Sequence, residues 1–287
     1  MNVSVCVCTD RRPRSLQRLL DALVWIRADR VAGALEVVVL DADPAGSARE
    51  ACAETAPRLP WPLRYVHAPR AGASPRAGAA AAVRADADWI AFLDDDEEPT
   101  PRWLDELLRV QADYAADVVA GPVVPRFEAR VPAWVIGGRL FELPRHRTGT
   151  RLPCADAGNV LVRADVLRQS ADPEAVLGGA SGVVWADEAL AYEWVPPSRV
   201  SLRWLLRRAF RWGNAWAVCE RHLDSSRRVN TVRLARAAGR IARGTLLLAA
   251  SAVRGRDAAV QALRGICFAA GSLAGLAGFR IGEPFLG

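Results

Sequence analysis

Five consecutive carboxylates follow a short apolar segment in the first half of the chain. Residues 89–93 are typical of a buried strand, and directly after them come Asp94, Asp95, Asp96, Glu97 and Glu98. Repulsion among these groups is costly unless a cation lies among them, and hard oxygen ligands suit Mg²⁺ or Mn²⁺ that bridges to substrate phosphates. The run therefore predicts a metal–diphosphate site. The alternative is a solvated acidic turn before a helix that begins at Thr100-Pro101.

Segments typical of strands alternate with segments of helical spacing around this run. The predicted order is strand 3–8, a helix from about residue 15, strand 35–40, strand 63–66, helix 74–85 and strand 89–93. This alternation predicts a mostly parallel sheet with right-handed crossovers, and thus an α/β fold class.

Two further predicted strands also end in polar residues. Thr9 and Arg11 follow the first strand, and Asp41 and Asp43 follow the second. Ligands of parallel sheets bind outside the carboxyl ends of the strands, where an arginine can pair with a phosphate and an aspartate can accept from a base or a ribose. Together with the acidic run, these residues predict a nucleotide site. The sequence contains no G-x-G-x-x-G or P-loop motif, which argues against a dinucleotide enzyme or a P-loop NTPase.

The composition limits the class of protein and its partners. The chain has 287 residues, of which 51% are hydrophobic, enough for a large α/β domain with an appendage. All 38 basic residues are arginine, and the net charge of +6 favours anionic partners. The six cysteines show no C-x-x-C spacing, so we expect reduced thiols. The N-terminus enters a strand directly, so we expect no secretory signal and an active face in the cytosol.

The C-terminal third is basic and amphipathic. Arg203, Arg207 and Arg211 recur every four residues, a pattern typical of helices on a membrane surface. The apolar segments 245–253 and 265–279 are shorter than the roughly 20 residues that a span requires. We therefore expect peripheral attachment to the cytoplasmic face of the cell membrane; the alternative is a helical pair packed on the α/β domain. We expect no nucleic-acid partner, because no known binding motif accompanies these arginines.

An ordered set of segments resembles the landmarks of the family 2 glycosyltransferases. The segments are residues 3–13, 37–43, 91–97 with Trp103-Leu104, 116–123 and 158–163. A further stretch is similar to the tail of the bacterial succinoglycan-type exopolysaccharide subgroup, and it comprises residues 194–199, 204–208 and Gly213-Asn214. The resemblance covers nearly the whole chain.

This resemblance implies a Rossmann-like GT-A domain over residues 1–200, followed by a helical extension over 201–287. It implies inverting transfer of a sugar from a nucleoside-diphosphate sugar, with UDP favoured, to a lipid-linked or polysaccharide acceptor. Asp94 and Asp96 would bind the Mn²⁺ or Mg²⁺ that bridges the diphosphate. The residues expected to contact the nucleotide sugar are Thr9, Arg11, Asp41, Asp43, Asp94 and Asp95.

Three residues are candidates for contact with the acceptor. Asp156 and Asn159 could hydrogen-bond a sugar or shape a turn, and Trp134, in a proline-rich loop, could stack on a sugar ring.

The segment in which the family places its catalytic base is missing from this chain. The family has an acidic E-D-x-D-like stretch before the strand that here covers 182–186, whereas residues 172–181 run directly into that strand. Asp187 and Glu188 follow the strand and are the remaining candidates for the base. Two hypotheses remain open: an active transferase with another base, or a degenerate GT-A protein that serves as a binding or scaffold subunit.

Overall fold

The structure is a computed structural model that describes residues 1–69, 78, 82–152, 158–169, 182–223 and 226–279. The chain divides into two compact units. The first comprises Met1–Val124 and Leu143–Trp194, and the second comprises Pro125–Glu142 and Val195–Phe285. The predicted helix 74–85 lies mostly outside the described residues.

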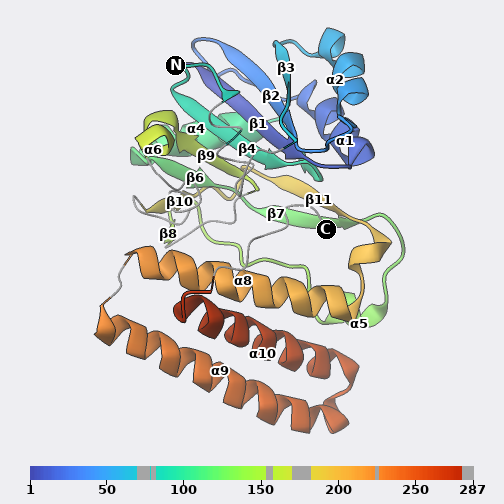
Figure 1. Ribbon diagram of the computed structural model, residues 1–287, viewed down its shortest axis with the longest axis vertical. Coiled ribbons are helices and arrows are strands. Elements are labelled where there is room, and N and C mark those ends of the chain that lie inside the picture. Colours follow the sequence, from blue (N-terminus) through green and yellow to red (C-terminus); the bar gives the residue numbers. More distant parts are fainter. Residues whose placement is uncertain (70–77, 79–81, 153–157, 170–181, 224–225, 280–287) are drawn as a thin grey trace. The chain divides into compact units, whose positions relative to one another are not determined.

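An eight-stranded sheet forms the centre of the first unit (Figure 1). Its order is β3 (Leu63–His67), β2 (Leu35–Asp41), β1 (Val3–Thr9), β4 (Trp89–Asp94), β9 (Val160–Arg163), β6 (Val118–Ala120), β10 (Val183–Trp185) and β8 (Arg151–Leu152). The pairs from β3 to β4 are parallel, as is the β6–β10 pair, whereas β9 runs antiparallel between β4 and β6 and β8 runs antiparallel to β10. The predicted mostly parallel α/β fold is confirmed.

The central strands are mostly apolar between Ser4 or Glu36 near their amino ends and the polar residues at their carboxyl ends, because both faces of the sheet are covered. Every residue of β2 is buried, and β1 and β4 each have a single partly exposed residue. Helix α1 (Pro13–Leu23) packs Leu16, Leu19, Leu20 and Leu23 into one apolar cluster with alternate residues of these strands. Residues of the opposite strand parity, such as Val38 and Phe92, form a second cluster on the other face.

The second half of the acidic run is part of a smaller sheet. Strand β5 (Glu97–Pro99) pairs antiparallel with β11 (Ala191–Val195), and β7 (Val123–Phe127) follows on the other side of β11. Helix α4 (Trp103–Tyr114) therefore begins later than the expected Thr100-Pro101, without a side-chain cap. A strand was not expected here because carboxylates and proline are both unfavourable in strands.

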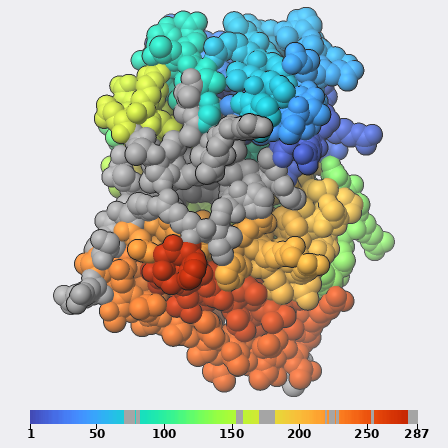
Figure 2. All heavy atoms as spheres, in the orientation of Figure 1, coloured from blue at the N-terminus to red at the C-terminus, as the bar shows by residue number. Residues whose placement is uncertain are grey.

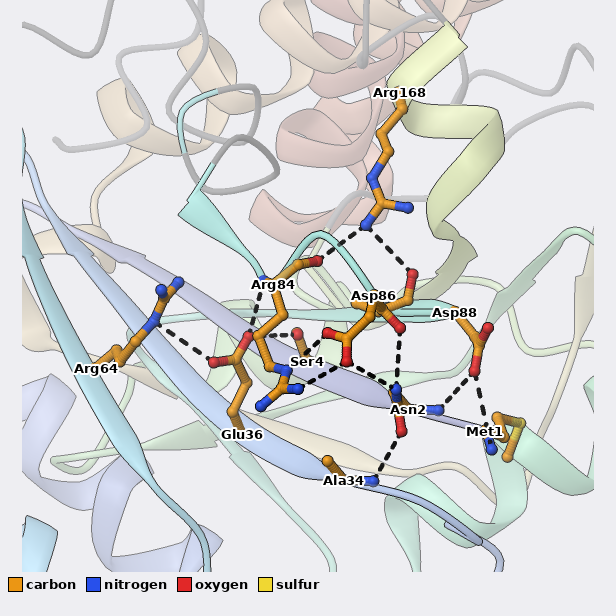
Figure 3. A network of polar contacts seen from close by, with 11 residues as sticks. Met1, Asn2, Ser4, Ala34, Glu36, Arg64, Arg84, Asp86, Asp88 and Arg168 are labelled. Atoms are coloured by element: carbon orange, nitrogen blue, oxygen red, sulfur yellow. Dashed lines mark hydrogen bonds and ion pairs between the residues drawn. The ribbon is translucent and has the colours of Figure 1, made fainter.

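A polar network lies at the amino ends of the central strands (Figure 3). The buried carboxylate of Glu36, in β2, accepts from the Ser4 hydroxyl at 2.7 Å and from the backbone N–H of Arg84 at 3.1 Å. The Arg64 Nε lies 3.5 Å from Oε2, the other oxygen of the Glu36 carboxylate. Nearby, the Asn2 side chain joins the backbone of Ala34 to Asp86. These contacts satisfy the buried polar groups at the end of the sheet opposite the predicted site.

The second unit is mainly helical. Helices α8 (Leu202–Leu223) and α9 (Arg227–Arg254) both pack against α10 (Arg256–Leu276), as Figure 1 shows, and α10 also contacts the short helix α5 (Ala133–Gly137). Glycines permit the close α8–α10 contact: a Cβ on Gly213 would collide with the Phe268 carbonyl, and one on Gly271 with the Phe210 carbonyl. Among the described helices, α10 alone has the length and composition to cross a membrane, a test that buried core helices also pass.

Candidate functional site

The parallel register brings three polar strand ends to one edge of the sheet. Thr9 in β1 is paired with Asp41 in β2, and Cys8 is paired with Asp94 in β4. The residues after these strands, including Arg11, Asp43 and the acidic run, therefore leave the sheet at the same edge. The structure thus brings together the residues that were predicted to contact the nucleotide sugar, although their side chains have different environments.

Asp95 is anchored inside the protein. Its side chain is 2% exposed, and it accepts from the Thr9 hydroxyl at 2.8 Å and from Arg12 Nη1 at 3.1 Å. Burial and the neighbouring Asp96 charge raise the pKa of Asp95 to about 7, against the opposing effects of Arg12 and Thr9. As placed here, the buried Asp95 fixes the acidic run to β1 through Thr9.

Arg12 is a residue of this site that sequence reasoning did not assign. Its Nη1 lies 3.1 Å from Asp95 Oδ1 and 3.4 Å from Asp96 Oδ2, so one guanidinium bridges two consecutive carboxylates. The signal in the sequence is weak, because Arg12 is one of three arginines around Pro13. Its position directly before helix α1 aims it at a strand end that lies more than 80 residues away in sequence.

Asp41 and Asp43 shape the loop that follows β2. The fully buried Asp41 carboxylate accepts from the backbone N–H groups of Asp43 and Ala48 and from the Tyr65 hydroxyl, each at 2.9 Å. Burial and this hydrogen bond raise the pKa of Tyr65 to about 12. Asp43 accepts from the Ala45 N–H at 3.0 Å, and that bond, followed by one from Ser47, lowers the pKa of Asp43.

Arg11 is the exposed cation of the edge. Its side chain is 71% exposed, and its Nε lies 3.7 Å from Asp10 Oδ1 and 3.6 Å from Asp43 Oδ1. Its φ of +57° is in the left-handed region, which turns the chain sharply between β1 and α1. Asp10 Oδ1 is buried and accepts no hydrogen bond from the described residues. The guanidinium thus remains accessible to an anion at this edge.

Asp94 and Asp96 supply the oxygen atoms expected to bind a metal. Asp94 is partly exposed at the end of β4, and its N–H donates to Glu97 Oε2 at 3.3 Å. Gly158 lies against the side chains of Asp94 and Glu97, since a Cβ at Gly158 would collide with Glu97 and lie 3.2 Å from Asp94 Oδ2. Carboxylate oxygens suit Mg²⁺ or Mn²⁺. Within the described part of the chain, however, no three His, Cys, Asp or Glu side chains are grouped as a metal site.

Trp194 holds the outer half of the acidic run. Its indole N–H donates to Glu98 Oε2 at 2.7 Å, its backbone N–H donates to the Asp96 carbonyl at 2.9 Å, and the Arg18 guanidinium lies 4.9 Å from its ring centre. The antiparallel pairing of β5 with β11 places these groups together. Trp194 is one of ten tryptophans in the chain, and the sequence gives no specific signal for this role.

The residues proposed for acceptor contact have different surroundings. Asn159 is 1% exposed; its Oδ1 accepts from the Trp103 indole at 2.7 Å, and its Nδ2 donates to the carbonyls of Pro122 at 3.1 Å and Ala189 at 2.7 Å. All its hydrogen bonds are thus internal, and its role as placed is structural. Trp134 belongs to α5 of the second unit, where it packs against an apolar cluster under the Arg256 guanidinium. Asp156 lies outside the described residues.

Both candidates for the base are occupied by ion pairs. Arg145 holds Asp187 with two parallel hydrogen bonds, Nε to Oδ1 and Nη2 to Oδ2, each 2.9 Å long. Partial burial opposes ionisation of Asp187, but the bonds from Arg145 and the Trp185 indole outweigh it and lower its pKa. Glu188 Oε2 accepts from Thr148 and lies 3.3 Å from Arg109 Nη2. A carboxylate held in this way is a poor proton acceptor. The segment 172–181 lies outside the described residues.

Comparison with known proteins shows what this chain is similar to. Residues 4–170 match the family model described as Glycosyl transferase family 2. The chain is 31% identical to the succinoglycan biosynthesis protein ExoM of Rhizobium meliloti (strain 1021), over 74% of this chain and 73% of that protein.

Solved structures of S. aureus TarS 1-349 share the fold. The structure in complex with UDP has a TM-score of 0.52 at 16% identity, and the structure in complex with UDP-GlcNAc has 0.53 at 14%; each covers 97% of this chain and 92% of the other. The predicted GT-A fold is thereby confirmed.

Proposed function

Because this chain belongs to glycosyl transferase family 2, in the exopolysaccharide subgroup, we propose that it moves a sugar from a nucleoside-diphosphate sugar to a lipid-linked or polysaccharide acceptor. An acceptor hydroxyl attacks the anomeric carbon in line, the bond from that carbon to the diphosphate oxygen breaks, and the anomeric centre inverts. The hydroxyl proton passes to a base, and the nucleoside diphosphate leaves.

The observation that carries this proposal is the convergence of polar strand ends at one edge of the sheet. Arg11, the exposed cation there, would pair with a donor phosphate. Thr9 and Asp95 keep the acidic run in place beneath it, and Asp41 with Asp43 shapes the loop expected beside the base or ribose. A UDP-sugar is the favoured donor, with support from the TarS structures that hold UDP and UDP-GlcNAc.

Asp94 and Asp96 would hold Mn²⁺ or Mg²⁺ against the diphosphate. The chemistry of these donors fits the ion, which would offset the charge that grows on the leaving diphosphate. Asp96 is the more constrained of the two, since Arg12 lies 3.4 Å from its Oδ2 and Trp194 binds its carbonyl. Asp94 is partly exposed at the strand end, where it can meet a ligand.

Calorimetric titration of UDP into the full-length protein, with Mn²⁺ and again with EDTA, tests the donor site. We expect metal-dependent binding that is lost in Asp94→Asn and retained in Asp113→Asn, which removes a carboxylate on α4 away from the strand ends. Equal binding in EDTA would overturn the metal assignment. Absence of binding by folded protein, with GDP tested as well, would overturn the donor site.

A second function is favoured by the environment of Asp187 and Glu188. Since both carboxylates are bound to cations, the described residues offer no evident base after β10. A GT-A protein that binds its donor without efficient transfer would serve as a binding or scaffold subunit. Sugar transfer to a lipid-linked acceptor that disappears in Asp96→Asn would contradict this alternative, whereas donor binding without turnover would favour it.

The basic second unit supports attachment to the cytoplasmic face of the membrane, where a lipid-linked acceptor would be found. Arg203 and Arg207 are exposed on α8, while Leu205 and Ala209 of the same helix are buried. This division into a basic and an apolar face suits a peripheral surface helix.

A further inference from the structure

The second unit contains a cavity of about 500 Å³, and all its described lining residues belong to that unit. Side chains from α8, α9 and α10 line it, together with the residues that follow α5. Its size is in the range of small-molecule sites. The surface of these helices is the orange and red region of Figure 2.

The described lining contains four arginines, Arg139, Arg240, Arg243 and Arg264, and no acidic residue. Arg139 is paired with Glu142. The other three make no ion pair with any residue in the described ranges. Four like charges around one space repel one another, so the cavity has a positive potential that an anion would offset.

Arg264, on α10, is the partly buried cation of this group. Its Nη1 donates to the carbonyl of Arg139 at 3.4 Å, so a neutral oxygen is its only described hydrogen-bond partner. Burial, and then the charge of the nearby Arg208, lowers the pKa of Arg264. Its guanidinium therefore lacks the anionic partner that a partly buried arginine ordinarily has.

Apart from Gln261, whose side-chain amide donates to the Gly138 carbonyl at 3.0 Å, the other described side chains of the wall are apolar. The Arg240 guanidinium lies 5.0 Å from the ring centre of Phe268, and the Trp212 ring meets Phe268 edge-on with centroids 6.1 Å apart. Leu247 continues this surface along α9, and Gly265 leaves room beside it, because a Cβ there would meet no atom within 4 Å. A small hydrophilic anion would fill only the arginine end, whereas a ligand with an attached apolar group would contact both parts.

We propose that this cavity binds a phosphate-bearing amphiphile, with the phosphate among Arg240, Arg243 and Arg264 and the apolar chain along Trp212, Leu247 and Phe268. A phosphate matches several guanidinium groups because it carries more charge and more acceptor oxygens than a carboxylate. The inference concerns the second unit alone and does not depend on sugar transfer.

Calorimetric titration of dihexanoyl phosphatidic acid, kept below its micelle concentration, into the full-length protein tests this proposal. Inorganic phosphate and dihexanoyl phosphatidylcholine serve as the other two probes. We expect phosphatidic acid to bind at least about tenfold more tightly than either. Inorganic phosphate has no apolar chain, and the phosphate of phosphatidylcholine is esterified with a cationic choline. Tightest binding by inorganic phosphate would reduce the cavity to a free-phosphate site, and equal binding of the phosphatidylcholine would exclude phosphate recognition; both overturn the proposal.

A charge variant with a matched control locates the site. Arg240→Gln removes a cation from the cavity, and Arg236→Gln removes one from the same helix outside it. We expect Arg240→Gln to weaken phosphatidic acid binding about tenfold and Arg236→Gln to leave it unchanged. Equal weakening by both variants would show a diffuse charge effect and overturn the proposal.

A steric variant keeps the test independent of charge. A Cβ at Gly265 or at Gly239 would meet no atom within 4 Å, but only Gly265 lines the cavity. Gly265→Leu therefore fills the cavity and should abolish binding of phosphatidic acid, whereas Gly239→Leu should not. Circular dichroism checks that both variants are folded. Unchanged binding in Gly265→Leu, or no binding by the folded wild-type protein, would overturn the proposal.

Discussion

At the scale of single residues, adjacent carboxylates of one acidic run have different tasks. Asp95 is held by Thr9 and Arg12 inside the protein, while its neighbour Asp94 is partly exposed at the end of β4. Burial and the charge of Asp96 raise the pKa of Asp95. In the loop after β2, hydrogen bonds from the Ala45 N–H and from Ser47 have the opposite effect and lower the pKa of Asp43.

The ion pair between Asp187 and Arg145 predicts a pH-dependent effect on stability. The pKa of Asp187 is lowered on folding, so the pair contributes stability above the unfolded value, near 3.8, and loses it as the pH falls through the folded value. At neutral pH we expect Arg145→Gln to lower the free energy of unfolding, by about 1 kcal/mol or less at this partly exposed site. Urea denaturation at several pH values measures the difference.

The difference between wild type and Arg145→Gln should shrink as the pH falls below about 4. Arg145→Lys, which keeps the charge and loses the two parallel bonds, is the control and should lie between them. A difference that stays constant down to acidic pH would contradict the assignment of the effect to the Asp187 carboxylate.

Asn159 offers a test of a structural against an acceptor-binding role. Asn159→Asp is nearly isosteric, but it replaces an amide donor with a carboxylate facing the carbonyls of Pro122 and Ala189. We expect a loss of at least about 1–3 kcal/mol in the free energy of unfolding, the cost of leaving buried groups unpaired. Thermal or urea denaturation measures it. Unchanged stability with weaker acceptor binding would instead support the acceptor role.

At the scale of elements, two kinds of contact could not be read from local patterns. Strand β5 forms because the backbone of β11 pairs with the backbone of the acidic run, with Glu97 opposite Glu193 and Glu98 opposite Tyr192. Helices α8 and α10 approach closely because Gly213 and Gly271 lack side chains. In both cases the deciding partner lies far away in sequence.

The glycines of the C-terminal helices should respond to alanine in opposite directions. Gly271→Ala places a Cβ against the Phe210 carbonyl in α8, so we expect overpacking to cost about 1–3 kcal/mol. Gly239→Ala places its Cβ in open space on α9 and should stabilise that helix by about 0.5–1 kcal/mol. Urea denaturation followed by far-ultraviolet circular dichroism compares them. A stabilising Gly271→Ala would contradict the close α8–α10 contact.

At the scale of the whole molecule, the excess of arginine predicts how the protein is held at a membrane. The net charge is +6, and exposed arginines of α8 and α9 contribute to it. Attraction between exposed arginines and anionic lipid weakens as salt shortens the Debye length, about 10 Å at 0.1 M. Peripheral attachment and a span by α10 therefore differ in their response to salt.

We expect concentrated salt to release the full-length protein from isolated membranes without detergent. Sedimentation after the wash, followed by immunoblotting, measures the released fraction. An integral membrane protein of the same host is the control that must stay in the pellet. Retention after the salt wash, with release only by detergent, would show that α10 spans the bilayer.

The sequence by itself determined the family, the α/β fold and the edge of the sheet at which the polar residues meet. This was possible because the runs of β1, β2 and β4 are mostly apolar, and parallel strands place their carboxyl ends together. It also predicts that the acidic segment in which the family places its base is missing, and this stays a prediction.

Only the tertiary structure decided which polar side chains face a ligand and which hold the fold together. Arg12 bridges Asp95 and Asp96, Asn159 bonds Trp103, Pro122 and Ala189, and Arg264 meets Arg139 in a cavity. Local sequence patterns indicate whether a residue lies on the buried or the exposed face of its own helix or strand. They do not report which distant group satisfies it, because that depends on contacts between residues 30 to 125 positions apart in sequence.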